Sequence, residues 1–573
     1  MATHTIDQPD YSALAGKRRS EHRPNAGEAC AEAVADYVER RYDSLEEGIM
    51  RSRRYAQLAT VTLVVLLLLA CAPEPDGELS TVAPEAQTLA APLASVTLAP
   101  LLSPTVVPST ALPGTATPNA HACSASNVAY EIEATLDWPS QSLEVEETLT
   151  FHNDTGHPLD ALVLAFPGTI APEELTLKRI ALGNSALRDY ILNGQQLILP
   201  LPSPLLPTEV VQVSLRFNLS IPPIRSGYRH GHLGYWGYSA RQTNLGLWFP
   251  QLLPYKEENG WTWHQFWPVG ETNVSRAANY RVTLRVQGAP DTLRVAGPGA
   301  FVRSSANTWR FELCDSRELS LSLSDQFRLL TTTSAGGTPV ELFLLDSGDE
   351  QAMHAARHAL QVATDALDLF EERFGPFLFD RLVVVEGDFP DGMEFSGLVF
   401  VSEAWFRTWQ GTPNDWLTLI TAHEVAHQWW YAAVGNDQAA APYLDEALAT
   451  YSELLFVEHY YPELVEWWWA FRVNAYSPSG PVDMPVTAFN APRPYINTVY
   501  LQGARMLHDL RLAMGDEAFF AWLTHYVEAM RGKIAEPADF WGAMTAEAYA
   551  LTAPIRQQYL AQASVVSLPD AIP

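Results

Sequence analysis

The chain is poor in cations for its length. Its 573 residues include 36 lysines and arginines against 66 aspartates and glutamates, which gives a formal net charge of −30. Nucleic-acid binding depends on lysine and arginine contacts to phosphate, so this balance argues against a nucleic-acid partner. Hydrophobic residues are not scarce: they make up 47% of the chain, enough for the cores of two or more domains.

Long hydrophobic runs are also rare, and one of them indicates export. Residues 51–54 are mostly basic, and the apolar residues 55–70 lead to a Leu-Leu-Ala-Cys sequence that ends at Cys71. A run of about sixteen residues is short for a membrane span, whereas a basic start, an apolar centre and a small residue before a cysteine are typical of a lipoprotein signal. We therefore interpret residues 50–71 as a lipoprotein signal or membrane anchor.

The signal starts at Met50 and not at the first residue of the chain. Residues 1–49 are therefore predicted to be a non-native extension of the reading frame. The alternative is a cytoplasmic tail followed by one short membrane helix. Both alternatives place the rest of the chain at the extracytoplasmic face of the cell membrane, held by a lipid anchor or by a single N-terminal helix.

Cysteine is rare, with Cys30, Cys71, Cys123 and Cys314 as its only occurrences. If Cys30 is absent from the mature protein and Cys71 carries lipid, Cys123 and Cys314 are left to pair in an oxidising compartment. Two separately buried thiols are the alternative, and the sequence leaves both open.

Charge is missing from most of the segment that follows the signal. Residues 72–122 are rich in proline, threonine, alanine and leucine, and no charged residue lies between Glu85 and Glu131. Proline at this frequency prevents regular structure, so we predict a disordered, semi-extended linker with a maximum length of roughly 150 Å. It would hold the folded part of the chain away from the membrane surface.

Two different patterns follow the linker. Residues 123–335 contain short segments of alternating apolar and polar residues between proline, glycine and asparagine breaks, which predict an antiparallel β-sandwich-like domain. Residues 336–573 mix strands with helices and end in helices; one amphipathic helix is predicted over residues 349–374. His354 and His358 in that helix are four positions apart but have no following glutamate, so we interpret them as exposed or capping side chains.

The main chemical motif is an H-E-x-x-H formed by His423, Glu424 and His427, with Glu446 eighteen residues further on. Two histidines four positions apart project from one side of a helix, so both can reach one ion, and Glu446 can supply a third ligand. Three protein ligands with an open position are the catalytic arrangement of zinc. Glu424 points roughly 100° round the helix, where it would accept a proton from a zinc-activated water.

Capping and stop signals surround this motif. The helix that carries the histidines is predicted to start after Asn414 or Asp415 and to continue to Gly435. A second helix is predicted from Glu446 to about Tyr460. The three ligands would therefore come from two neighbouring helices.

The segments HEVAHQWW, VGND and LDEALATY resemble the catalytic core of the aminopeptidase N family of gluzincin metallopeptidases. The resemblance implies one zinc ion per chain, held by His423, His427 and Glu446, with Glu424 as the general base. It also implies peptide substrates and a thermolysin-like α/β peptidase domain that follows an N-terminal β domain. Long members of the family carry further C-terminal domains, for which this chain is expected to have no length left.

Two further elements of the family are matched in part. Gly392, Met393 and Glu394 resemble the G-A-M-E-N strand, whose glutamate holds the α-amino group of the substrate, although the flanking residues differ. Tyr500, in Tyr-Leu-Gln-Gly, resembles the tyrosine of a Y-x-K-G pattern that donates its hydroxyl to the oxyanion. The A-R-x-x-F-P-C-x-D stretch of the β domain, which also contributes to substrate binding, has no match.

The sequence therefore predicts a multidomain α+β protein that acts as an extracytoplasmic, membrane-tethered zinc aminopeptidase. One alternative is a zinc endopeptidase of the same fold, which would tolerate a blocked substrate amine. The other is a surface lipoprotein that binds peptides without cleaving them. The sequence leaves the oligomeric state open.

Overall fold

The structure, a computed structural model, describes residues 105–106, 123–167, 174–224, 234–345 and 348–562. The predicted N-terminal extension, the signal or anchor and most of the predicted linker lie outside these residues. Within the described ranges, no helix is both long enough and apolar enough to cross a membrane.

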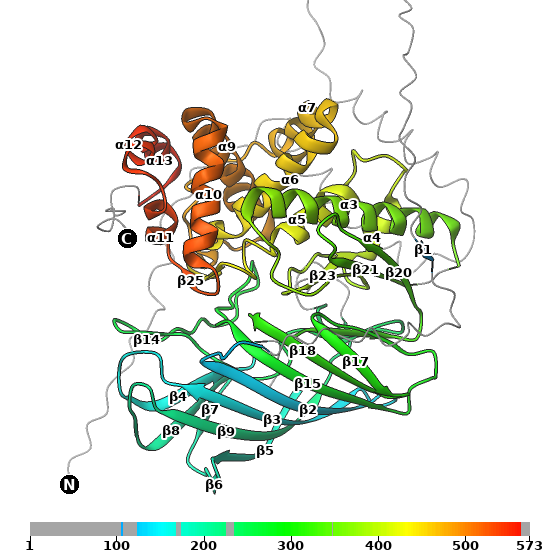
Figure 1. Cartoon of the computed structure of the whole chain (residues 1–573), viewed down its shortest axis with the longest axis vertical. Coiled ribbons are helices and arrows are strands. Elements are labelled where there is room, and N and C mark those ends of the chain that lie inside the picture. The colour runs from blue at the N-terminus through cyan, green and yellow to red at the C-terminus, as the bar shows by residue number, and fades with distance from the viewer. Residues whose placement is uncertain (1–104, 107–122, 168–173, 225–233, 346–347, 563–573) are drawn as a thin grey trace, which may run out of the picture. The chain divides into compact units, whose positions relative to one another are not determined.

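An eight-stranded sheet makes up much of the N-terminal region, in the order β17-β18-β15-β2-β3-β9-β5-β6 (Figure 1). All of its pairs are antiparallel except β15 with β2, which run parallel. β9 and β15 therefore run in the same direction, and the chain between them is a crossover connection, because a hairpin joins only antiparallel strands. The β-rich class is as predicted, with this one parallel pair as the exception. The strands are β2 (Val128–Asp137), β3 (Ser142–His152), β5 (Leu175–Leu182), β6 (Ser185–Ala186), β9 (Val210–Ser220), β15 (Ala278–Gln287), β17 (Ala300–Ser305) and β18 (Thr308–Ser316).

The alternating pattern of β3 shows why these segments form strands. Leu143, Val145 and Leu149 are buried, while Glu144 and Glu146 on the opposite face are exposed. Two four-stranded sheets complete this region, in the orders β12-β4-β8-β7 and β10-β11-β19-β16. Their strands are β4 (Leu159–Ala165), β7 (Ile191–Asn193), β8 (Gln196–Leu205), β10 (Trp236–Tyr238), β11 (Thr243–Leu245), β12 (Gln251–Leu252), β16 (Arg294–Ala296) and β19 (Leu321–Ser324), and a small hairpin joins β13 (Tyr255–Lys256) to β14 (Gly260–Trp261).

A five-stranded sheet in the order β1-β20-β21-β22-β23 begins the second region. The boundary predicted after residue 335 falls in the turn between β20 and β21, so β20 pairs into this second sheet. The two-residue strand β1 lies within the segment predicted as a linker. The strands are β1 (Thr105–Val106), β20 (Phe327–Thr333), β21 (Pro339–Leu345), β22 (Leu382–Gly387) and β23 (Leu398–Ser402).

Helices cover one side of this sheet, and the eight-stranded sheet lies on its other side (Figure 1). The predicted helix α3 (Glu350–Phe374) is present, capped by the Asp349 side chain, which accepts a hydrogen bond from the backbone of Gln351. It ends at Gly375, whose φ of 95° favours glycine. The other helices include α4 (Glu403–Thr408), α5 (Trp416–Ala426), α6 (Glu446–Tyr460), α7 (Val465–Trp468), α8 (Pro492–Tyr495), α9 (Gln502–Met514), α10 (Asp516–Met530), α11 (Pro537–Gly542), α12 (Ala546–Leu551) and α13 (Ala553–Tyr559).

Helix α5 is shorter than the sequence suggested. Asp415 caps its start as predicted, but the prediction that the helix continues to Gly435 is wrong, because it ends at Ala426 with His427 as the C-cap. Beyond His427 the chain turns, and the backbone N–H of Ala432 donates to the His427 carbonyl at 2.9 Å. Helix α6 has the bounds that were predicted.

The two regions are joined by a buried arginine. Arg317 is 1% exposed, and its guanidinium donates to backbone carbonyls that include those of Tyr431 (3.2 Å), Ala433 (3.1 Å) and Lys533 (2.7 Å). Gly435 leaves room for it, since a Cβ at that position would lie 2.7 Å from the guanidinium carbon. The loop between β18 and β19 therefore fixes the turn that follows His427.

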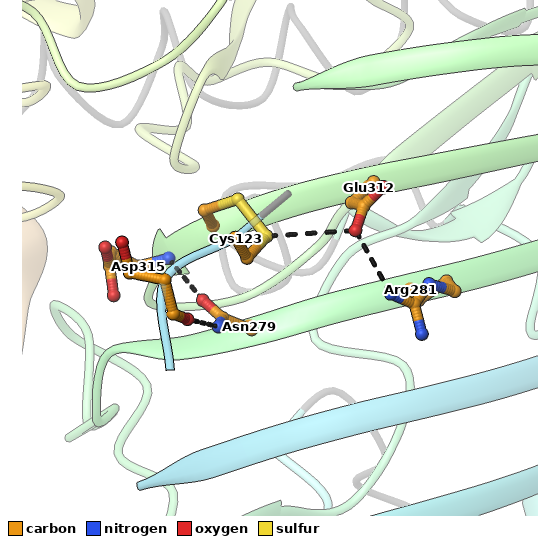
Figure 2. The surroundings of a disulfide bond; sticks show 7 residues. Cys123, Asn279, Arg281, Glu312 and Asp315 are labelled. Carbon is orange, nitrogen blue, oxygen red and sulfur yellow. Dashed lines mark hydrogen bonds and ion pairs between the residues drawn. A yellow bond between two sulfur atoms is a disulfide. The ribbon is translucent and has the colours of Figure 1, made fainter. Parts of the chain in front are cut away.

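A disulfide joins Cys123 to Cys314, with their Cα atoms 5.3 Å apart, so the paired alternative holds. Figure 2 shows that Asn279 lies beside it: the Asp315 backbone N–H donates to Asn279 Oδ1 at 3.0 Å. Arg281 on the same strand as Asn279 forms an ion pair with Glu312 at 3.2 Å. The bond therefore fastens the beginning of the described chain to β18.

Candidate active site

The three predicted metal ligands converge. His423 and His427 present their Nε2 atoms to each other at 3.2 Å, and Glu446 Oε2 lies 3.2 Å from the first Nε2 and 3.5 Å from the second. All three residues are buried, with 4% or less of each exposed. Two imidazole nitrogens and one carboxylate oxygen that face one point are a donor set suited to zinc.

The outer nitrogen of each histidine is held by a second acceptor. His423 Nδ1 lies 2.9 Å from Glu453 Oε1, and His427 Nδ1 lies 2.9 Å from the Trp430 carbonyl oxygen. Hydrogen bonds at Nδ1 leave the Nε2 lone pairs for the metal and fix the orientation of both rings. The early end of α5 matters here, because only a turned chain brings the Trp430 carbonyl to His427.

Glu453 also belongs to the candidate site, although the sequence motifs did not indicate it. It is fully buried on α6, two turns after Glu446, and accepts two hydrogen bonds of 2.8 Å from Arg472 and one of 3.2 Å from Trp468. Burial opposes its ionisation, but the charge of Arg472 and these hydrogen bonds hold its pKa below the usual range. Glu453 follows Glu446 by seven residues, which places both carboxylates on one face of the same helix, so the sequence could have indicated that Glu453 lies near the predicted ligands.

Glu424 lies in the same cavity, against Gly392. A side chain at position 392 would displace the Glu424 carboxylate, so glycine at this position leaves room for the carboxylate as it stands in the cavity. Glu424 is 6% exposed, and burial raises its pKa well above the usual range. A carboxylate with a raised pKa is suited to accept a proton from water and pass it on.

Glu394 belongs to a second cluster of carboxylates. It is 4% exposed and accepts a hydrogen bond of 3.0 Å from Gln438 Nε2. Oxygen atoms of Glu271, Glu394 and Glu446 all lie within 4.8 Å of one another. Burial, followed by the charge of Glu271, raises the pKa of Glu394 well above its usual range, and a bound cation would relieve this repulsion.

Glu271 was not predicted. It comes from the loop between β14 and β15 of the β-rich region, more than a hundred residues before Glu394. The surrounding Trp-Pro-Val-Gly-Glu-Thr-Asn sequence has neither periodicity nor a ligand spacing that could have drawn attention to it. Only the packing of the two regions brings it to the cavity.

Met393 is the predicted site residue that does not face the cavity. Its side chain is 3% exposed and packs into the apolar core of the β-rich region, and its backbone forms a bridge with Phe400. Its neighbours Gly392 and Glu394 do line the cavity. Alternation along an extended segment explains this, since adjacent side chains point to opposite faces.

Tyr500 lies beside His423 on the cavity wall. Its ring is parallel to that of His423, with 5.9 Å between centroids, and it lies on a π-helical segment, Ile496–Leu501, that precedes α9. Burial and then the charge of Glu446 raise its pKa well above the usual range, so it stays protonated and able to donate. π-Helical turns are frequent at functional sites because they re-aim side chains.

A single cavity of about 420 Å³ contains these groups. Its wall combines the metal ligands, Glu424, Glu394, Glu271 and Tyr500 with apolar and basic side chains that include Trp405, Trp416, Ile420, Arg472, Tyr476, Arg493 and Tyr495. The volume falls in the range of small-molecule sites.

The other histidine pair has a structural role. His354 is exposed beside Glu350, at 4.0 Å, and His358 stacks on Trp409 with its Nε2 2.7 Å from the Thr418 hydroxyl. Burial lowers the pKa of His358 to about 4. Neither histidine belongs to a possible metal group in the described part of the chain.

Comparison with known proteins agrees with this geometry. The family model described as the Peptidase family M1 domain matches residues 358–559, a stretch that contains all of the proposed zinc ligands. Residues 358–559 therefore form an M1 peptidase domain. M1 is the family of gluzincin metallopeptidases to which the aminopeptidase N pattern belongs.

Relatives of this chain include human endoplasmic reticulum aminopeptidase 2, 26% identical over 234 residues, which are 38% of this chain and 24% of the relative. Rice aminopeptidase M1-A is 27% identical over 203 residues, 33% of this chain and 23% of the relative. The matched region thus spans about a quarter of the length of these curated relatives.

The fold is that of two-domain M1 metallopeptidases. The M1 zinc metallopeptidase from Deinococcus radiodurans superposes with a TM-score of 0.53 at 20% identity, and the match covers 79% of this chain and 97% of that one. A mutant of a two-domain M1 zinc metallopeptidase bound to L-arginine gives 0.54 at 19% identity, with coverage of 78% and 98%. The predicted fold class, a β domain followed by a gluzincin peptidase domain, is confirmed.

Proposed function

We propose that this chain is a zinc aminopeptidase, exported and held at the membrane surface, that removes N-terminal residues from peptides. The observation that carries the proposal is one cavity in which a three-ligand metal site lies beside the carboxylates of Glu394 and Glu271. The metal site serves hydrolysis, and the two carboxylates serve recognition of a positively charged amine. A mutant of the Deinococcus radiodurans neighbour bound to a Tyr-Ser-Ala substrate supports peptides as the substrate class.

The donor set fits one zinc ion. Both Nε2 atoms approach the same oxygen of Glu446, while each Nδ1 is occupied by another acceptor. A zinc ion bound there supplies a Lewis acid that polarises a carbonyl and lowers the pKa of water. The carboxylate cluster of Glu271, Glu394 and Glu446 shares a ligand with this site, so the two are not independent metal sites.

The protein side chains then divide the remaining work. Glu424 accepts the proton of the attacking water and delivers it to the nitrogen of the leaving peptide. Tyr500 donates its hydroxyl hydrogen to the substrate carbonyl oxygen as negative charge develops on it. Glu394 and Glu271 bind the α-ammonium of the substrate through charge-assisted hydrogen bonds, which places the first peptide bond at the reacting groups.

Three features support export and tethering. The basic and apolar residues before Cys71 have the order of a lipoprotein signal, and the linker has the composition of a tether. The Cys123–Cys314 disulfide is typical of an oxidising compartment. Metabolic labelling with a radioactive fatty acid tests the anchor: labelling of the wild-type chain that Cys71→Ala abolishes is expected, and equal labelling of both would exclude lipidation at Cys71.

The activity is tested with zinc content and hydrolysis measured on the same samples. We expect the wild-type protein to hydrolyse alanyl and leucyl peptides with a free N-terminus, to lose activity with a chelator and to ignore N-acetylated peptides. Glu424→Gln should retain zinc and lose at least a hundredfold in kcat. Hydrolysis of N-acetylated peptides at the same rate as free ones would identify an endopeptidase instead, and full activity of Glu424→Gln would refute the assigned base.

A further inference from the structure

Among the described residues, no carboxylate forms an ion pair with Arg493, which lines the cavity wall. Arg472, the other arginine that the described part of this wall contains, already accepts its counter-charge from Glu453 through two hydrogen bonds of 2.8 Å. Since five carboxylates also line this cavity, an arginine that pairs with none of them is available to a ligand.

The side chain of Arg493 is held in place by an aromatic ring. Its guanidinium carbon lies 4.5 Å from the centroid of the Tyr476 ring, a cation–π arrangement. The prolines on either side, at 492 and 494, fix the backbone φ of the short helix α8. Asn497 donates to the Tyr476 carbonyl at 3.3 Å and so ties this ring to the segment that carries Tyr500. A stacked guanidinium keeps its N–H edge free for a planar acceptor such as a carboxylate.

Arg493 lines the same cavity as the predicted metal ligands and the carboxylates of Glu394 and Glu271. Oxygen atoms of Glu394 and Glu271 lie within 4.8 Å of an oxygen of Glu446, so this part of the wall is acidic. A short peptide in this cavity therefore meets carboxylates suited to its ammonium group and the guanidinium of Arg493, which is suited to its carboxylate.

We propose that Arg493 binds a carboxylate on the leaving part of the peptide, and that the enzyme is thereby selective for short peptides. This inference rests on the proposed aminopeptidase function. In a dipeptide or tripeptide the C-terminal carboxylate lies one or two residues beyond the cleaved bond, about 3.5–7 Å in extended chain. An acidic side chain near the cleaved bond offers the same chemical group. The charge-assisted pair makes the substrate complementary at both ends.

The test compares peptides that differ only in this carboxylate. Leu-Ala-Ala, its C-terminal amide, the amide of Leu-Glu-Ala and leucine p-nitroanilide are assayed with the zinc-loaded wild type, with Arg493→Gln and with Arg407→Gln. Arg407 is exposed on α4 and does not line the cavity, so its substitution removes the same charge from the protein without touching the site.

We expect the wild type and Arg407→Gln to favour Leu-Ala-Ala over its amide by about tenfold in kcat/KM, mainly through KM, which corresponds to about 1.4 kcal/mol. Arg493→Gln should lose this preference and hydrolyse the anilide, which has no carboxylate, within twofold of the wild type. If the amide of Leu-Glu-Ala is hydrolysed faster than the amide of Leu-Ala-Ala, a side-chain carboxylate also binds to Arg493. If the two amides are hydrolysed alike, Arg493 binds only the C-terminal carboxylate.

A wild type that treats all of the peptides alike, or an Arg493→Gln variant that keeps the tenfold preference, would overturn the proposal. Equilibrium binding of the same peptides to zinc-loaded Glu424→Gln measures the preference without chemistry. If that preference depends on Arg493 while no peptide or anilide is hydrolysed by the wild type, the carboxylate site stands and the proposed activity fails.

Discussion

Replacing Glu453 with glutamine separates its effect on the metal from its effect on stability. Glu453 Oε1 lies 2.9 Å from His423 Nδ1, and the same carboxylate compensates the charge of Arg472, whose side chain is 5% exposed. The neutral amide cannot increase the basicity of His423 as a carboxylate does, and loss of such a partner typically weakens metal affinity 10- to 100-fold. We expect Glu453→Gln to bind zinc about that much more weakly in competition with a chromophoric chelator.

The same substitution leaves a guanidinium buried without its counter-charge. Breaking a buried ion pair at one partner costs about 3–5 kcal/mol, so the free energy of unfolding in denaturant should fall by that amount. Replacing both partners, Glu453→Gln with Arg472→Met, removes the unpaired charge and should restore most of the stability. The double variant should still bind zinc weakly, because His423 has not regained its carboxylate.

The pH dependence adds a second measurement. The pKa of Glu453 is depressed in the folded protein, so its contribution to stability is fully present above its unfolded pKa and disappears as the pH falls through the folded value. The difference in unfolding free energy between wild type and Glu453→Gln should therefore shrink in strong acid. The role assigned to Glu453, support of His423 as a zinc ligand, would be refuted if Glu453→Gln bound zinc as tightly as the wild type.

Three other predictions follow from the described contacts. Tyr500→Phe should retain zinc and lower kcat by about 10²–10³-fold, measured with aminoacyl anilides, because one oxyanion donor is lost; a wild-type kcat would contradict this. Glu147 is 1% exposed and has no hydrogen-bond partner among the described residues, and burial raises its pKa, so the folded state loses stability as pH rises from the unfolded pKa of this carboxyl toward its folded pKa. Glu147→Leu should add about 1–3 kcal/mol to the unfolding free energy at pH 8 and less at pH 5. Cys123→Ser with Cys314→Ser should reduce it by roughly 2–5 kcal/mol, and urea titration that finds no change would show the bond to be dispensable.

The convergence of His423, His427 and Glu446 could be predicted because it depends on residues that are close together in the sequence. His423 and His427 are one helical turn apart, and Glu446 opens the next long helix, so the ligand set depends on helix periodicity and one spacing. Glu453 was equally local, two turns along the helix from Glu446, and a search for acidic residues on the ligand face of α6 would have found it. The spacing of residues along α6 does not predict that Arg472, from another element, forms the ion pair with Glu453.

The carboxylate cluster of Glu271, Glu394 and Glu446 shows what the sequence could not provide. Glu271 approaches Glu394 only because the β-rich region packs on the peptidase region, and no pattern within either segment encodes that contact. The end of α5 at Ala426 was missed for a similar reason. The residues after it, with two tryptophans and two alanines, have good helical periodicity, but the turn satisfies tertiary contacts to His427 and Arg317 that outweigh local propensity.

Arg317 and Glu271 connect the β-rich region to the candidate site in the peptidase region. The Arg317 guanidinium binds carbonyls of the turn that follows His427, and a loop of the same region places Glu271 beside Glu394. A peptidase fragment cut before residue 327 would lose both Glu271 and the contacts of Arg317 with this turn. Chimaeras that exchange whole β regions between relatives should therefore inherit substrate behaviour from the donor of that region.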